Sequence, residues 1–323
     1  MDTVHPGRRW WGLVILTLGV SIIIVDATVV NVAIPTIIGD LDLSAPDAEW
    51  MNTIYSLVFA ALLISVGRAG DLIGRRRLFL AGVVVFVAAS VWAGTAGSAA
   101  ALITARLVQG IGGAMILPST LSTVNAMFRG RERAIAFGVW GSVIGGMAAL
   151  GPLVGGWLTT DHSWRWIFYI NVPVGVIAVV GALLLVPETR DEHAPRGFDL
   201  PGVLASALGL GALVFALIEG QRYGWWEPTA TFSAFGADWP SETVSIVPVS
   251  AALAVVLLAG FVLLERRRGR AGKPVIVDLS MFRITSFING NLAAMVVSLG
   301  ELGLIFALPL FIQSVLGYTA LQT

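Results

Sequence analysis

Long apolar runs recur along this chain of 323 residues, and short polar segments separate them. A helix needs about 20 apolar residues to cross the roughly 30 Å hydrocarbon core of a bilayer, and we count about nine such runs. Backbone groups in hydrocarbon must be paired within the segment, which favours helices. We expect an all-α integral membrane protein with transmembrane helices near residues 12–38, 49–66, 78–97, 99–124, 135–159, 166–186, 200–219, 246–265 and 285–315.

The composition supports a lipid environment. Hydrophobic residues make up 56% of the chain and charged residues 12%, with a mean hydropathy of +0.84, whereas soluble domains carry about 25% charged residues. The chain has no cysteine, which excludes disulfides, thiolate metal ligands and cysteine nucleophiles. The three histidines, His5, His162 and His193, fall in separate loops, so we expect no metal site.

The loop cations predict the orientation. Only Arg165 and Arg222 fall in loops on one side of the predicted membrane, and cytoplasmic loops are the ones enriched in Arg and Lys. We therefore expect a multi-pass cell-membrane protein with a cytoplasmic N-terminus. The first run is too long for a signal peptide and lacks a small-residue cleavage site, so we interpret it as a helix. The cations predicted to be cytoplasmic are Arg8, Arg9, Arg68, Arg75, Arg76, Arg77, Arg129, Arg131, Arg133, Arg190, Arg196, Arg266, Arg267, Arg268, Arg270, Lys273 and Arg283.

Three ionisable residues, Asp26, Arg106 and Glu301, are predicted to lie well inside the bilayer. A charge there costs about 2.5–3.5 kcal/mol on insertion scales, so such groups face a polar cavity or one another. At about 1.5 Å per residue, Asp26 lies roughly 9 Å from the outer face and Arg106 about 10 Å below it. The two can therefore meet. The alternative is that Arg106 extends outward and Asp26 bonds to backbone.

A polar stripe marks the last predicted helix. Asn291, Ser298 and Glu301 share one face of an otherwise apolar segment. We expect them to line a cavity, and hydrogen bonding between helices is the alternative.

The segment GRAGDLIGRRR at residues 67–77 joins the second and third predicted helices. We place Asp71 just before the third helix, where a carboxylate can accept bonds from free backbone amides. Gly67 and Gly74 permit a tight turn. A basic cytoplasmic loop accounts for the arginines, but it does not call for an aspartate and glycines at these spacings.

The fifth predicted helix is rich in glycine. Gly141 with Gly145, and Gly151 with Gly155, give small-xxx-small spacings, and Pro152 removes a backbone donor. Such a helix can pack closely and bend. Generic helix packing explains these glycines nearly as well.

Four ordered motifs resemble the major facilitator superfamily. The loop at 67–77 resembles its helix 2–3 signature, and LITARLVQGIGGA at 102–114, which includes Gln109 and Gly110, is similar to its helix 4 motif. GPLVGG at 151–156 resembles its antiporter motif, with Gly151, Pro152, Gly155 and Gly156. DATVVNVAIP at 26–35 and WRWIFYINVP at 164–173 resemble the fourteen-helix drug:proton antiporter subfamily. Ala69 and Met147 depart from the usual residues.

The resemblance implies a division of the chain and roles for its residues. It implies an N-terminal six-helix bundle at 1–187, a linker with two extra helices at 188–265, and the start of a second bundle at 266–323. Asp26 would carry the proton, with Arg106 as its electrostatic partner. Asp71, Arg75 and Arg76 would belong to a cytoplasmic latch. Asn31, Asn291, Ser298 and Glu301 are expected to line a cavity, with Gln109 as a further candidate.

The resulting hypothesis is an exporter that exchanges inward-moving protons for outward-moving amphiphilic compounds such as antibiotics. Its expected partners are the lipid bilayer, a small-molecule substrate and protons; we expect no nucleic acid and no cofactor, since the proton gradient would drive it. The chain contains no phosphate-binding G-x-x-x-x-G-K-[ST] loop and no HExxH or Gly-x-Ser-x-Gly motif, so neither an ATP-driven exporter nor an enzyme is expected. The alternative is a membrane fragment that cannot transport alone.

Overall fold

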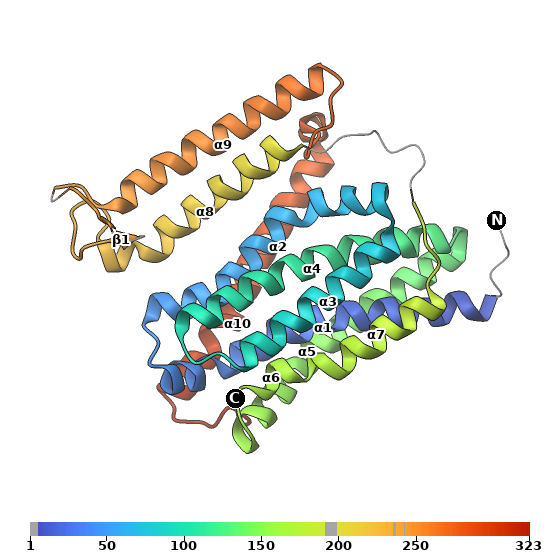
Figure 1. Ribbon diagram of the computed structural model, residues 1–323, viewed down its shortest axis with the longest axis horizontal. Coiled ribbons are helices and arrows are strands. Elements are labelled where there is room, and N and C mark those ends of the chain that lie inside the picture. Colours follow the sequence, from blue (N-terminus) through green and yellow to red (C-terminus); the bar gives the residue numbers. More distant parts are fainter. Residues whose placement is uncertain (1–5, 191–198, 235–236, 242) are drawn as a thin grey trace.

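The computed structural model describes residues 6–190, 199–234, 237–241 and 243–323. Helices dominate these residues, as Figure 1 shows. In chain order the elements are α1 (Pro6–Leu41), α2 (Ala45–Ile73), α3 (Arg75–Gly94), α4 (Ala99–Met127), α5 (Gly130–Asp161), α6 (Trp166–Tyr169), α7 (Asn171–Leu185), α8 (Leu200–Tyr223), β1 (Ser233–Ala234), β2 (Ala237–Asp238), α9 (Ile246–Arg270), the 3₁₀-helix η1 (Leu279–Arg283) and α10 (Thr285–Ser314).

The expected all-helical membrane fold is confirmed, apart from the two-residue antiparallel pair of β1 and β2. Every predicted run corresponds to a helix, with the run at 166–186 divided into α6 and α7 at Ile170. Among the described residues, 7 helices are long and apolar enough to cross a membrane, or 8 if the bent α2 counts as one span. α10, the ninth predicted span, is a helix of 30 residues but is not among these.

Local sequence signals explain where several helices begin. Ser44 accepts a bond from the Asp47 amide while Asp47 bonds back to the Ser44 amide, which forms a capping box at the start of α2. The hydroxyl of Ser98 caps α4, and the carboxylate of Asp199 caps α8.

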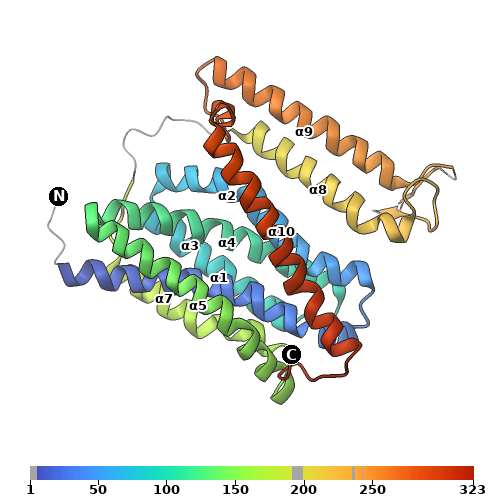
Figure 2. The same cartoon turned by 180° about the vertical axis from the view of Figure 1, so that it is seen from behind.

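Helix α1 lies at the centre of the bundle formed by α1–α7. It packs along α5 and α7, while α4 packs against α2 and α3 (Figures 1 and 2). Two apolar clusters fill the interior, one around Leu16, Phe79 and Phe86, the other around Ile34 and Phe168. Burial of these side chains brings five helices close enough for polar side chains to meet at the bundle centre.

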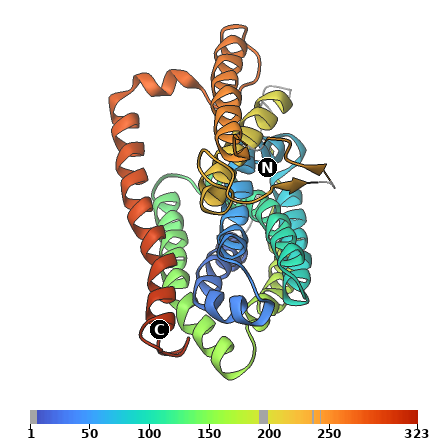
Figure 3. The ribbon, with the colours of Figure 1, turned by 90° about the vertical axis from the view of Figure 1, so that its left-hand side faces the viewer.

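The remaining helices lie outside this bundle. α8 and α9 form a hairpin that packs against α2, and α10 stands at one side of the bundle in Figure 3. Their outward faces are apolar: Leu208 and Val255 are exposed, as expected for surfaces in contact with lipid. The boundaries at 187 and 265 stay predictions.

The loops separate by charge. The start of α1, the α2–α3 turn and the α4–α5 turn lie at one end of the bundle, toward the right of Figure 1, and carry the arginine-rich segments. The α1–α2 turn and the β1–β2 segment lie at the opposite end. The predicted segregation of cations is therefore present in three dimensions for the described loops; Arg196 lies outside the described residues.

Candidate functional site

An ion pair lies at the centre of the bundle. Asp26 of α1 is 1% exposed and Arg106 of α4 is 0% exposed, and Nη1 of Arg106 donates to Oδ2 of Asp26. The predicted meeting of these two side chains is confirmed, and the alternative in which Arg106 extends outward is wrong. The pair exists because each charge would be costly to bury without the other.

Neutral polar groups complete the coordination of Asp26. Its Oδ1 accepts from Nε2 of Gln109 at 3.0 Å and from Nδ2 of Asn171 at 3.2 Å. Both amides also donate to the hydroxyl of Ser90, at 2.8 and 3.2 Å, and Oε1 of Gln109 accepts from Arg106 at 2.9 Å. Both carboxylate oxygens of Asp26 thus accept hydrogen bonds from donors on α4 and α7. We call Asp26, Ser90, Arg106, Gln109 and Asn171 the core cluster.

Helix α2 covers the arginine side of the core cluster. Nε of Arg106 donates to the carbonyl oxygen of Met51 at 3.3 Å, and the guanidinium carbon lies 4.4 Å from the centre of the Tyr55 ring. Nη2 of Arg106 has no hydrogen-bond partner, so the ring face of Tyr55 supplies its stabilisation as a cation–π contact. Tyr55 therefore separates the core cluster from an open space between α1, α2 and α10.

That space is a cavity of about 410 Å³ between α1, α2 and α10. Asn31 lies in its wall, where its amide accepts from Asn52 at 3.1 Å and donates to the Ala27 carbonyl at 2.7 Å. Its position is as predicted. The cavity wall is mixed, with amides, hydroxyls, one carboxylate and the rings of Tyr55 and Phe306. Such a lining suits a compound with both polar and apolar parts.

Two residues predicted to line a cavity, Asn291 and Ser298, are not in the wall of this one. Asn291 and Ser298 are exposed on α10, and the Asn291 amide bonds to the carbonyl of Phe287 in the preceding turn. The side chain of Glu301 lies outside the described residues. α10 meets α1 through its later turns, where Nε2 of Gln313 donates to the Val32 carbonyl at 3.0 Å and Phe306 lines the cavity. The described residues place no helix beside the first half of α10, and the cavity position of Asn291 and Ser298 stays a prediction.

The 67–77 segment forms the turn between α2 and α3, but one predicted contact is wrong. Asp71 lies in the last turn of α2 and accepts from Nε and Nη2 of Arg75 at 2.9 and 2.8 Å. It does not cap α3. The amide of Arg76 donates instead to Oε1 of Glu188 at 3.0 Å, so a carboxylate beyond α7 satisfies the free amide.

The glycines of this segment permit close contacts. Gly74 adopts φ +118°, which disfavours any residue with a Cβ, and a Cβ there would also lie 2.6 Å from Glu188. A Cβ on Gly67 would lie 3.1 Å from Pro118 of α4. Nη1 of Arg75 donates to the Ser122 carbonyl at 3.3 Å, so the turn is tied to α4 as well.

The glycines of α5 divide into two groups. A Cβ on Gly151 or Gly155 would collide with Thr28 or Val29 of α1, and Gly156 meets the carbonyl of Ala320. Gly141 and Gly145 have open space beside them, so their predicted close packing is not found among the described residues. Pro152 lies within α5 and is exposed. The 151–156 motif therefore brings α5 against the part of α1 that carries Asp26.

Gly110 has the same role between α4 and α2. A Cβ at this position would lie 2.7 Å from the Tyr55 carbonyl oxygen and 3.2 Å from Val58. The absence of a side chain lets α2 approach α4 closely enough for Tyr55 to contact Arg106, one turn earlier on α4.

Several polar residues were not singled out from the sequence. Ser90, Asn171 and Tyr55 are neutral and stand in apolar runs, where they give no strong signal. Glu219 and Glu265 are buried, at 5% and 2% exposure, although the sequence placed only Asp26, Arg106 and Glu301 deep in the membrane. Both acids stand near the ends of their runs, which made them resemble interfacial charges.

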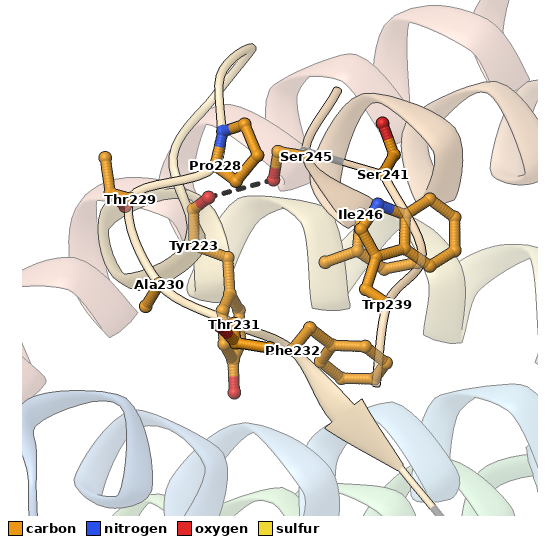
Figure 4. A pocket seen from close by; sticks show the side chains of 10 residues that line it. All are labelled: Tyr223, Pro228, Thr229, Ala230, Thr231, Phe232, Trp239, Ser241, Ser245 and Ile246. Atoms are coloured by element: carbon orange, nitrogen blue, oxygen red, sulfur yellow. Dashed lines mark hydrogen bonds between the residues drawn. The ribbon is translucent and has the colours of Figure 1, made fainter. Parts of the chain in front are cut away.

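A second cavity lies at the opposite end from the N-terminus, beside the start of α9. Figure 4 shows its aromatic wall, with Tyr223, Phe232 and Trp239, and the Ser245 hydroxyl donating to the Tyr223 carbonyl at 3.0 Å. Within the part of the chain that the structure describes, no carboxylate or cation lines it. Trp226 is exposed nearby. Among the described residues, no group of three potential metal ligands occurs; His5 and His193 lie outside them.

Several apolar helices long enough to cross a membrane, packed around a buried ion pair, identify a multi-pass membrane protein. Comparison with known families makes this specific: the chain matches the Major Facilitator Superfamily over residues 16–323 and belongs to it. The fold agrees, since a crystal structure of a peptide transporter (POT) in complex with sulfate covers 70% of this chain and 48% of its own, with a TM-score of 0.51 and 19% identity.

The curated relatives are exporters and resistance proteins. The puromycin resistance protein pur8 of Streptomyces alboniger is 37% identical across 98% of this chain and 58% of its own length. A probable actinorhodin transporter of Streptomyces coelicolor is 37% identical across 97% and 52%, and the multidrug efflux pump LfrA of Mycolicibacterium smegmatis is 35% identical across 99% and 59%. The chain thus spans little more than half the length of these relatives.

Proposed function

We propose that the protein is a proton-coupled antiporter that exports small amphiphilic compounds, of the fourteen-helix drug:proton type. The observation that carries this proposal is the core cluster, which holds one carboxylate at the bundle centre beside a cavity for a small molecule. The related resistance and efflux proteins support a drug-like substrate.

In this proposal Asp26 carries the proton. When ionised, it is held by Arg106, Gln109 and Asn171. Protonation removes the charge that Arg106 neutralises, so the guanidinium needs another partner or a change in its surroundings. Tyr55 lies between Arg106 and the cavity. A shift of Arg106 would therefore move the cavity wall, which links proton occupancy to the shape of the substrate site.

The remaining motifs would control the conformational cycle. Asp71, Arg75 and Arg76 lie at the arginine-rich end of the bundle, which the positive-inside rule assigns to the cytoplasm. There they would contact a second helical bundle when that side is closed, since alternating access requires two bundles that move about a central site. The cell membrane is the proposed location, with the N-terminus in the cytoplasm.

Transport into everted membrane vesicles tests this function. Vesicles containing the full-length protein are given an inside-acid pH gradient, and the accumulation of a panel of dyes and antibiotics is followed. We expect accumulation that collapses when nigericin removes the gradient. Accumulation that is insensitive to nigericin would contradict proton coupling. The same assay on residues 1–323 alone measures whether these residues suffice for export.

A further inference from the structure

Ser90 of α3 is fully buried, at 0% exposure, and its hydroxyl takes part in three hydrogen bonds. It donates to the Phe86 carbonyl at 2.9 Å, one turn earlier in α3. Because a hydroxyl has a single proton, that bond leaves only acceptor sites for the amides of Gln109 and Asn171. Toward the rest of the core cluster, Ser90 is therefore an acceptor alone.

The two amides are each shared between Ser90 and Asp26. Nε2 of Gln109 lies 2.8 Å from Oγ of Ser90 and 3.0 Å from Oδ1 of Asp26, and Nδ2 of Asn171 lies 3.2 Å from both oxygens. A primary amide carries two N–H groups, so each amide can serve both acceptors at once. The acceptor at Ser90 thus keeps the nitrogen of each amide, and not its oxygen, on the side that faces Asp26.

Close helix packing fixes the position of Ser90 relative to these amides. A Cβ on Gly112 of α4 would lie 2.7 Å from the backbone nitrogen of Phe86, and a Cβ on Gly175 of α7 would collide with Val87. Both glycines stand about one turn from the amide of their own helix, and Phe86 and Val87 stand about one turn from Ser90. The hydroxyl therefore joins α3, α4 and α7 where their backbones approach closely.

The bonds of Ser90 differ from those of Asp26 in one respect that matters for a proton carrier. In the proposed cycle Asp26 gains and loses a proton, and hydrogen bonds to a charged acceptor are stronger than those to a neutral one. No hydrogen bond among the described residues joins Ser90 to Asp26, and a serine hydroxyl keeps its charge state. Its bonds to the two amides can therefore persist through both states of Asp26.

We propose that Ser90 is a positioning residue of the proton-coupling site, which acts through Gln109 and Asn171 to keep two donors directed at Asp26 throughout the cycle. This inference rests on the proposed function, to which it adds a neutral residue that neither charge nor motif marks. Side chains held by a supporting hydrogen bond need no rearrangement when their partner returns. Ser90 is not in the wall of the cavity between α1, α2 and α10, so its loss should slow proton-driven export without weakening substrate binding.

Three substitutions of Ser90 in the full-length protein test this role. Proton-driven export is measured in everted vesicles, and affinity is measured in nanodiscs without a gradient, for the fluorescent dye of the panel that is exported fastest, such as ethidium. Ser90→Ala removes the hydroxyl, and we expect export to fall about fivefold to tenfold, the factor that one hydrogen bond of ordinary net strength supplies. The dye affinity should stay within about twofold.

The other two substitutions separate the hydroxyl from the size of the side chain. Ser90→Thr keeps the hydroxyl oxygen and should retain at least about half of the export rate. Ser90→Cys is close to serine in size, but a thiol is a weak acceptor, so its export should resemble that of Ser90→Ala. Full export in Ser90→Cys would overturn the proposal, because side-chain size would then explain the residue. Normal export in Ser90→Ala, or equal losses of export and affinity, would overturn it as well.

Ser21→Ala is the matched control. Ser21 is buried on α1, at 5% exposure, and among the described residues its hydroxyl bonds only to the Thr17 carbonyl of its own helix, at 2.8 Å. The substitution removes a buried hydroxyl from the helix that carries Asp26 but leaves the core cluster unchanged. We expect export and dye affinity within about twofold of the unaltered protein.

A measurement of stability separates this inference from the proposed function. The free energy of unfolding in mixed micelles is compared for Ser90→Ala, Asp26→Asn and the double variant. Because the two residues share both amides, we expect that the two single losses do not add. Additive losses would contradict the positioning role even in a protein that exports nothing. Failure of the unaltered protein to show nigericin-sensitive export would contradict the proposed function alone.

Discussion

Two groups of buried charges differ in how well they are satisfied. In the core cluster, one carboxylate and one guanidinium meet, and both oxygens of Asp26 accept hydrogen bonds. In the second group, which we call the end cluster, Asp199 and Glu265 lie together with Arg268 where α8 begins and α9 ends. Asp199 is 3% and Glu265 2% exposed, yet Oδ2 of Asp199 and Oε1 of Glu265 have no hydrogen-bond partner.

The difference is one of charge balance. Arg268 lies 3.3 Å from Oδ2 of Asp199, and the end cluster contains a second carboxyl group, that of Glu265. The two unpartnered oxygens both lie beside Gly202, at 2.6 and 2.8 Å from where its Cβ would be. A single proton shared between these carboxyls would satisfy both oxygens and balance the arginine. The core cluster thus pairs one carboxylate with one guanidinium, whereas the end cluster holds two carboxyl groups and one arginine.

The largest expected effect comes from neutralising the acid of the core cluster. Asp26→Asn keeps the shape of the side chain but removes the charge that balances Arg106, and it cannot carry a proton. We expect proton-driven export by the full-length protein to fall below detection, at least a hundredfold, in the everted-vesicle assay.

Asp40→Asn serves as the control for this substitution. It makes the same chemical change in the same helix, at an exposed residue whose partner Arg165 lies 2.8 Å away near the membrane surface. We expect export within about twofold of the unaltered protein, because exposed ion pairs contribute about 0–1 kcal/mol. If Asp26→Asn kept normal export with normal pH dependence, Asp26 would not be the proton carrier.

The next effect is on stability. Arg106→Leu replaces the guanidinium side chain with a smaller apolar group and leaves Asp26 buried without its cation; the loss of one partner from a buried pair costs about 3–5 kcal/mol. The free energy of unfolding, measured by adding sodium dodecyl sulfate to mixed micelles, should fall by that amount. The double variant Asp26→Leu with Arg106→Leu should recover most of the loss. A double variant as unstable as the single one would show that the arginine acts through packing alone.

The sequence predicted this ion pair well because charges in apolar runs are rare and depth along a helix follows from its rise. The sequence could not predict that Asn171 and Ser90 belong to the core cluster, because neutral polar side chains are tolerated in membrane helices and do not stand out in an apolar run. Glu188 caps α3 from 112 positions along the chain, a contact that depends on tertiary packing. Helical periodicity likewise assigned Asn291 to one face of its helix, but periodicity does not say which neighbour covers that face.

A smaller effect is expected in the end cluster. In Glu265→Gln, the new side-chain NH₂ group can donate a hydrogen bond to Asp199, which replaces the shared proton. The side-chain oxygen still accepts from the backbone amide of Val277, which lies 2.9 Å from Oε2 of Glu265 in the unaltered protein. We expect no loss of stability at neutral pH. Glu265→Ala removes both interactions and should cost about 1–3 kcal/mol, measured in the same micelles. A loss in Glu265→Gln equal to that in Glu265→Ala would show that both carboxyls are ionised and that no proton is shared.

The smallest effect on stability is expected for a partly exposed pair, Asp71 with Arg75, whose side chains are 30% and 15% exposed. Asp71→Asn should lower the free energy of unfolding by less than about 1 kcal/mol, since water screens part of the charge.

The effect of Asp71→Asn on transport should be larger than its effect on binding. In the proposed cycle Asp71 acts only when the cytoplasmic side closes, so substrate affinity should stay within about twofold of the unaltered protein, while the rate of proton-driven export falls several-fold. Asp161→Asn neutralises an exposed acid at the last residue of α5, and it should change neither the substrate affinity nor the export rate. Equal losses of affinity and export rate in Asp71→Asn would place Asp71 with the core cluster, as part of the binding machinery, and not with the surface elements that open and close the protein.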